Sequence, residues 1–144
     1  MKKVAHILSR KGNSVISVSP QSTVLSVLQL MADKNIGSVV VMDNNQYKGL
    51  ITERDYARKI ILLGKTSGET NAAEIMSTGL PRVTPDSSIE ACMHIMSDNN
   101  IRYLPVFDNT DAICGIISIL DVVTEAIHSH KETIDLLHSY IQTS

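Results

Sequence analysis

The stretch GLITERD, residues 49–55, is followed 66 residues later by GIISILD, residues 115–121. Both have a glycine, two aliphatic residues, a hydroxyl residue and, three positions after the hydroxyl, an aspartate. The aliphatic residues are typical of the end of a buried strand. The spacing Ser/Thr-x-x-Asp is typical of a helix start, where a capping box satisfies free backbone N–H groups. Each stretch therefore predicts a strand that runs directly into a helix.

The sequence around these two stretches is also repeated. An apolar helical stripe in residues 24–31 recurs 65 positions later in 89–96, and SVVVMDNN (38–45) corresponds to YLPVFDNT (103–110). Each half predicts a short strand, a helix, two strands joined by Asp-Asn turn residues, and a final helix. We expect an α/β (α+β) protein of two tandem β-α-β-β-α repeats with pseudo-twofold symmetry, their apolar sheet faces packed together.

The repeat also sets the expected boundaries. The lead-in segments HILS (6–9) and EIMS (74–77) correspond, and three extra residues around Arg10 to Asn13 follow only the first of them. The polar, glycine-bearing stretch between the repeats is typical of a linker. The expected parts are residues 1–63 for the first repeat with its lead-in segment, 64–73 for the linker, 74–128 for the second repeat, and 129–144 for an amphipathic C-terminal helix or tail.

Composition limits the classes of partner. The 144 residues are 43% hydrophobic and 19% charged, which suits one globular unit or two tightly joined halves. A net charge of -2 and a pI near 6.2 argue against a broad surface for nucleic acid or for membranes. We find no apolar run typical of a signal peptide or of a membrane span, so we expect a cytoplasmic protein.

Several residues that could carry chemistry lack the necessary spacing. Cys92 and Cys114 do not have a metal-type spacing, and Cys92 falls on the apolar face of a predicted helix. His128, His130 and His138 form no tight ligand set. The sequence also lacks a G-x-S-x-G elbow, a G-x-G-x-x-G loop and a Walker motif. We therefore predict no metal site, no catalytic residue and no enzyme.

The duplicated unit, with hydrophobic-hydrophobic-Ser/Thr-x-x-Asp at its last strand–helix junction, resembles a pair of CBS domains, often called a Bateman module. The resemblance spans roughly residues 6–128. The block NIRYLPVFDNTDAICGIISILDVV (100–123) is similar to the usual second repeat of the family. The block ITERDYARKII (51–61) resembles a subgroup of small stand-alone bacterial CBS proteins. The resemblance implies a regulatory module.

The two junctions are the predicted ligand sites. A helix N-terminus attracts phosphate, a hydroxyl can donate to a phosphate oxygen, and an aspartate can accept ribose hydroxyls. The resemblance assigns these roles to Thr52 and Asp55 in the first repeat and to Ser118 and Asp121 in the second. The alternative is that both pairs only cap helices, although one aspartate could do both.

The resemblance also implies an apolar adenine slot in the cleft between the repeats. Each slot would come from the lead-in strand and second strand of one repeat, set against the junction of the other. For any single aliphatic member, core packing is the alternative role. One site would combine Val15, Ile16, Ile36 and Gly37 with Ser118 and Asp121, and the other would combine Leu80, Pro81, Ile101, Arg102 and Tyr103 with Thr52, Arg54 and Asp55.

Charge separates the two predicted sites. Arg54 lies within TERD, and Arg102 is at a position where the family often has a basic residue near phosphate, whereas SILD has no basic residue. Guanidinium groups suit phosphate oxygens. We therefore expect Thr52, Arg54 and Asp55 to form the better phosphate site, unless Arg54 belongs to an ordinary solvated helix face.

The function that follows is a sensor that binds AMP, ADP, ATP or NAD as a regulatory ligand, requires no cofactor, and responds through differential affinity for two arrangements. All four share adenine, ribose and phosphate groups. The resemblance implies a homodimer formed through the apolar final helices, residues 60–63 and 122–127. The alternative is a ligand-free dimerisation scaffold that docks on a target protein. A third hypothesis, a hydrolase, lacks an activated nucleophile.

Overall fold

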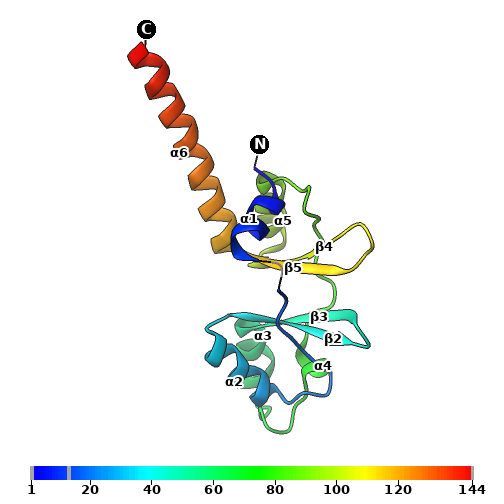
Figure 1. Ribbon diagram of the computed structural model, residues 1–144. Helices are drawn as coiled ribbons and strands as arrows, with labels where there is room; N and C mark the ends of the chain where they lie inside the picture. The colour runs from blue at the N-terminus through cyan, green and yellow to red at the C-terminus, as the bar shows by residue number, and fades with distance from the viewer. Residues whose placement is uncertain (1, 13, 144) are drawn as a thin grey trace. The chain divides into compact units, whose positions relative to one another are not determined.

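The computed structural model describes residues 2–12 and 14–143 (Figure 1). The chain forms two compact units. One consists of Ser14–Leu80, and the other combines Met1–Asn13 with Pro81–Ser144.

The unit Ser14–Leu80 contains the first repeat. Its three-stranded sheet has the order β1-β2-β3, with β1 parallel to β2 and β2 antiparallel to β3. The strand β3 runs directly into a helix at Thr52, as GLITERD predicts. Its elements are β1 (Ser17–Val18), α2 (Val24–Lys34), β2 (Ser38–Asp43), β3 (Gln46–Thr52), α3 (Glu53–Tyr56), the π-helical η1 (Ala57–Ile61) and α4 (Ala72–Ile75).

The other unit contains the second repeat. The strands β4 and β5 are antiparallel, and a single parallel bridge from Val83 to Val106 takes the place of a first strand. At Ser118, β5 runs directly into α6. The elements of this unit are α1 (Val4–Lys11), α5 (Ile89–Asn99), β4 (Tyr103–Phe107), β5 (Ile113–Ser118) and α6 (Ile119–Thr143).

The first long helix of each repeat begins and ends in the same way. The Thr23 hydroxyl accepts a hydrogen bond from the Ser26 N–H, and the Ser88 hydroxyl accepts one from the Ala91 N–H. Asn35 and Asn100 are the C-cap residues that follow α2 and α5, with φ angles of 53° and 52°. Asparagine tolerates this left-handed conformation better than most residues. The tandem β-α-β-β-α fold predicted from the repeated sequence is confirmed.

Each unit has its own hydrophobic core. Val24, Val27 and Met31 of α2 pack with β2 and β3 in one unit. Ile89, Cys92 and Met96 of α5 do the same with β4 and β5 in the other. Cys92 is 0% exposed and has a free thiol, so it serves as a small core residue, as its position in the apolar stripe indicates.

The lead-in segments do not pack with the repeats that directly follow them in the chain. Figure 1 shows α1, at the N-terminus, beside α5 and β5 of the second repeat. Leu8 of α1 lies over Gly115, and the residue after α4 that corresponds to Leu8, Met76, lies over Gly49. Ser77 also exchanges two backbone hydrogen bonds with Leu50, at 3.0 and 2.8 Å. The compact units therefore do not follow the expected boundaries at residues 63 and 74. The first lead-in segment, with α1, packs with the second repeat, and the second lead-in segment, residues 74–77, packs with the first repeat.

The C-terminal part is one continuous helix. We expected a separate helix or tail from residue 129, whereas α6 runs from Ile119 to Thr143. This stretch contains neither glycine nor proline, so nothing in it ends the helix near residue 129. Among the described residues, no helix combines the length and the apolar character that a membrane span requires.

Candidate functional site

The first junction is a reciprocal capping box between Thr52 and Asp55. The Thr52 hydroxyl oxygen accepts a hydrogen bond from the Asp55 N–H at 3.1 Å. In return, Asp55 Oδ2 accepts from the Thr52 N–H at 3.0 Å and from the Thr52 hydroxyl at 3.1 Å. This geometry holds the start of α3 on the end of β3.

The other oxygen of Asp55 is also engaged. Asp55 Oδ1 accepts a hydrogen bond from the Ser77 hydroxyl at 2.9 Å and lies 3.1 Å from Lys59 Nζ. Lys59 also donates to the Ile75 carbonyl at 2.8 Å. Asp55 is only 8% exposed. Both carboxylate oxygens of Asp55 thus have protein partners, and the lead-in segment supplies one of them.

The second junction repeats the capping box with different surroundings. The Ser118 hydroxyl accepts from the Asp121 N–H at 3.1 Å, and Asp121 Oδ2 accepts from the Ser118 N–H at 2.8 Å. Lys11 Nζ donates to the same Oδ2 at 2.7 Å and to the Ile116 carbonyl at 2.9 Å. Among the backbone groups and side chains that the structure describes, none donates a hydrogen bond to Asp121 Oδ1. One edge of this carboxylate is therefore open.

The surroundings keep Asp121 ionised near neutral pH. Partial burial raises the pKa of this carboxyl group. The Lys11 hydrogen bond, the Ser118 hydrogen bonds and the positive charge of Lys11 lower it by more, so the pKa of Asp121 lies below its usual value. Because the group is ionised, each of its two oxygens can accept hydrogen bonds, including the oxygen Oδ1 that has no partner among the described residues.

Lys11 is a site residue that the sequence-based reasoning missed. The segment between Ser118 and Asp121 contains no cation, whereas Lys11 reaches Asp121 from 110 positions away. The sequence does contain an indication of this contact, because the three extra residues around Arg10 to Asn13 add two cations to the first lead-in segment. SILD itself has no basic residue, as expected, but Lys11 gives the second junction a cation from another part of the chain, and the expected preference for the first junction stays a prediction.

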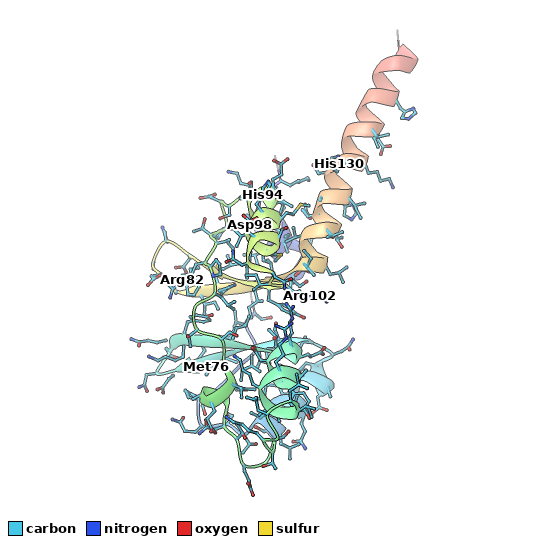
Figure 2. All side chains as sticks on the ribbon, turned by 180° about the vertical axis from the view of Figure 1, so that it is seen from behind. Met76, Arg82, His94, Asp98, Arg102 and His130 are labelled. Atoms are coloured by element: carbon cyan, nitrogen blue, oxygen red, sulfur yellow. The ribbon has the colours of Figure 1, made fainter. Side chains whose placement is uncertain are left out.

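Each junction contacts the start of the second strand of its own repeat. The Glu53 N–H donates to the Gly37 carbonyl at 3.2 Å, and the Ile119 N–H donates to the Arg102 carbonyl at 2.8 Å. Arg102, labelled in Figure 2, therefore lies beside the junction of Ser118 and is exposed. Arg54 is half-buried in α3. The expected pairing of each junction with residues of the other repeat stays a prediction.

The predicted adenine-slot residues are divided between the two units. Ile16 and Ile36 pack against the core of the first unit, and Ile101 packs against the core of the second. Core packing, the alternative role, is therefore present for these three side chains. All eight predicted slot residues are half-buried: Val15, Ile16, Ile36, Gly37 and Leu80 in one unit, and Pro81, Ile101 and Tyr103 in the other.

The histidines do not gather into a metal site within the described part of the chain. No group of three or more His, Cys, Asp or Glu side chains that could hold a metal ion occurs there. His94 lies on α5 and His130 on α6, as Figure 2 shows.

The fold and the two capped junctions define a class of α/β protein built from a duplicated β-α-β-β-α unit. The family model described as "CBS domain" matches residues 4–62 and 72–128. The chain belongs to the CBS-domain family, and the tandem pair predicted from the sequence is confirmed.

Two relatives and one solved structure show how closely the chain follows this family. It is 35% identical over 148 residues to "CBS domain-containing protein CBSX3, mitochondrial" of Arabidopsis thaliana, over 96% of this chain and 71% of that protein. It is 33% identical over 117 residues to "CBS domain-containing protein YhcV" of Bacillus subtilis (strain 168), over 81% of this chain and 82% of that protein. Since one relative is named mitochondrial, the cytoplasmic location stays a prediction.

The solved structure is of a putative signal-transduction protein with CBS domains from Burkholderia ambifaria MC40-6. It matches with a TM-score of 0.84 and 37% identity, over 88% of this chain and 95% of that one. Over that part of the chain, the fold is therefore shared with that protein.

Proposed function

We propose that this chain is a regulatory sensor that binds an adenosine-containing ligand, AMP, ADP, ATP or NAD, at its strand–helix junctions. The ligand acts by binding one arrangement of the module more tightly than another. No cofactor is required, and no catalytic step is involved. The observation that carries the proposal is the open Oδ1 of Asp121 in a junction that already holds Ser118 and Lys11.

The chemistry of the second junction suits such a ligand. A carboxylate oxygen without a protein partner can accept hydrogen bonds from ribose hydroxyls. The Ser118 hydroxyl oxygen accepts from the Asp121 N–H, and its own proton, which helps to stabilise the Asp121 carboxylate, can turn to a phosphate oxygen when a ligand binds. The N-terminus of α6 adds a partial positive charge to the same place.

The contacts favour the second junction over the first. At Asp55, a ribose would have to displace Ser77 or Lys59 from Oδ1, or Thr52 from Oδ2. At Asp121, Oδ1 can accept without such a loss. We therefore propose the reverse of the order expected from Arg54, with Ser118 and Asp121 forming the preferred site.

Thermal unfolding with and without AMP, ADP, ATP and NAD tests the proposed function. A ligand present at 100 times its dissociation constant should stabilise the native protein by about 2.7 kcal/mol. Calorimetry should show Asp121→Ala weakening ligand binding more than Asp55→Ala does. The opposite order would restore the sequence-based ranking, and the absence of any shift with all four ligands would reject the sensor function.

A ligand-free scaffold is the second candidate, and exposed apolar side chains favour it. Ile61, Leu62 and Leu63 are 59%, 75% and 65% exposed, and Leu120 and Ile127 on α6 are 71% and 61% exposed. Such side chains often mark a protein interface. We infer a homodimer through them under either function, with docking on a target protein under the second. Ile60 and Val122, which the sequence pattern grouped with this surface, are instead buried in the cores.

A further inference from the structure

The N-terminal helix α1 carries two adjacent cations that meet α6. Arg10 forms an ion pair with Glu125, which is 3% exposed, and Lys11 forms one with Asp121. Asp121 and Glu125 are four residues apart and so lie on successive turns of α6. The apolar side of α1 is anchored by Val4, Ile7 and Leu8 in the core. The end of α1 is therefore held at the second junction by both packing and charge.

Lys11 can still interact with a ligand while it holds Asp121. Its ammonium group has three N–H donors, of which Asp121 Oδ2 and the Ile116 carbonyl use two. The third donor has no hydrogen-bond acceptor within the part of the chain whose backbone and side chains are described. The side chain is 43% exposed, so its charge is accessible. An ammonium group attracts phosphate as a point charge.

The lysine at the first junction is placed differently. Lys59 Nζ lies 3.1 Å from Asp55 Oδ1, the oxygen that also accepts from Ser77, while Oδ2 is used by Thr52. Lys11 instead shares Oδ2 of Asp121 with the Ser118 N–H. The two lysines are similarly exposed, at 39% for Lys59 and 43% for Lys11. Among the described residues, it is the second junction that also has a carboxylate oxygen without a hydrogen bond.

We propose that Lys11 is a specificity-determining residue of the Ser118–Asp121 junction: it fixes Asp121 with Oδ1 open for ribose and selects ligands that carry phosphate. This inference rests on the proposed function and adds a residue to its site. Binding of a neutral nucleoside is strengthened only by the orientation of Asp121, whereas binding of a nucleotide is also strengthened by attraction between its phosphate and the charge of Lys11. Lys11 should therefore set the ratio of affinities for AMP and adenosine.

Calorimetric titration of the full chain with AMP and with adenosine tests this role. Lys11→Met should weaken AMP binding at least about tenfold, the loss typical of a hydrogen bond to a charged group. The same change should weaken adenosine binding by less than about threefold. Lys11→Arg should recover most of the AMP affinity. The matched control is Lys48→Met, because Lys48 is an exposed lysine on β3 whose Nζ donates to Gln46 at 3.4 Å, and it should bind both ligands as the unchanged protein does.

Equal losses for AMP and adenosine in Lys11→Met would show that Lys11 only supports the junction, and would overturn the proposal while leaving the sensor function intact. Unchanged affinity for both ligands would overturn it as well. If the unchanged protein binds neither ligand, melting temperatures measured with pyrophosphate distinguish a phosphate-binding role of Lys11 from the sensor function. A rise in melting temperature with pyrophosphate in the unchanged protein, but not in Lys11→Met, would support Lys11 as a phosphate-binding residue without the sensor function. No rise in either protein would overturn both.

Discussion

At the scale of single residues, the two glycines that open GLITERD and GIISILD are explained by the lead-in segments that cross them. A Cβ atom on Gly49 would lie 2.8 Å from the Ser77 carbonyl oxygen. A Cβ atom on Gly115 would lie 2.7 Å from Leu8 Cδ2. The first obstacle is backbone fixed by hydrogen bonds to Leu50, and the second is the end of a flexible side chain.

We therefore expect Gly49→Ala to destabilise the protein more than Gly115→Ala. Overpacking a core costs about 1 to 3 kcal/mol, and the upper part of that range applies where backbone must move. For Gly115→Ala we expect about 1 kcal/mol, since Leu8 can change its rotamer. Urea unfolding of both variants measures the difference. Equal losses would mean that the lead-in backbone at Ser77 yields as easily as a leucine side chain.

At the scale of elements, α1 and the segment after α4 occupy corresponding positions in their units but contact the junction aspartates through different chemical groups. Each crosses a glycine of the strand before a junction, and each supplies a partner for the junction aspartate. The first uses Lys11 and the second uses Ser77. Because α1 is also tied to α6 by Arg10 and the buried Glu125, its attachment depends on charge as well as on apolar packing.

Arg10→Met should destabilise the protein by about 3 kcal/mol, because Glu125 would remain as a buried carboxylate without its cation. The double variant Arg10→Met with Glu125→Met should recover most of that stability, since two apolar side chains can replace a buried pair at little cost. Denaturant unfolding of the single and double variants forms a double-mutant cycle that measures the coupling. A double variant as unstable as Arg10→Met would show that the arginine acts through packing alone.

At the scale of the whole molecule, each unit has its own exposed apolar side chains to examine for self-association, Ile61–Leu63 at the end of η1 in one and Leu120 and Ile127 on α6 in the other. Leu62→Asp should weaken the proposed homodimer at least about tenfold, the effect of burying one unpaired charge at an interface. The fold should be kept, because Leu62 is 75% exposed. Sedimentation velocity over a range of concentrations measures the change. Leu25→Asp is a matched control on α2, where Leu25 is 46% exposed, and an equal effect of both substitutions would contradict this choice of surface.

The sequence by itself determined the repeat, the family, the strand–helix junctions and the helix caps. These features depend on residues close together in the chain, such as Thr52 with Asp55 or Ser118 with Asp121, so their spacing carries the information. Only the tertiary structure decided which repeat each lead-in segment completes, and hence that Lys11 reaches Asp121 and Ser77 reaches Asp55. The side chains in those contacts are 110 and 22 positions apart. Local periodicity cannot encode such a pairing, because it arises from packing across Gly49 and Gly115, and that packing decides which aspartate keeps an oxygen open.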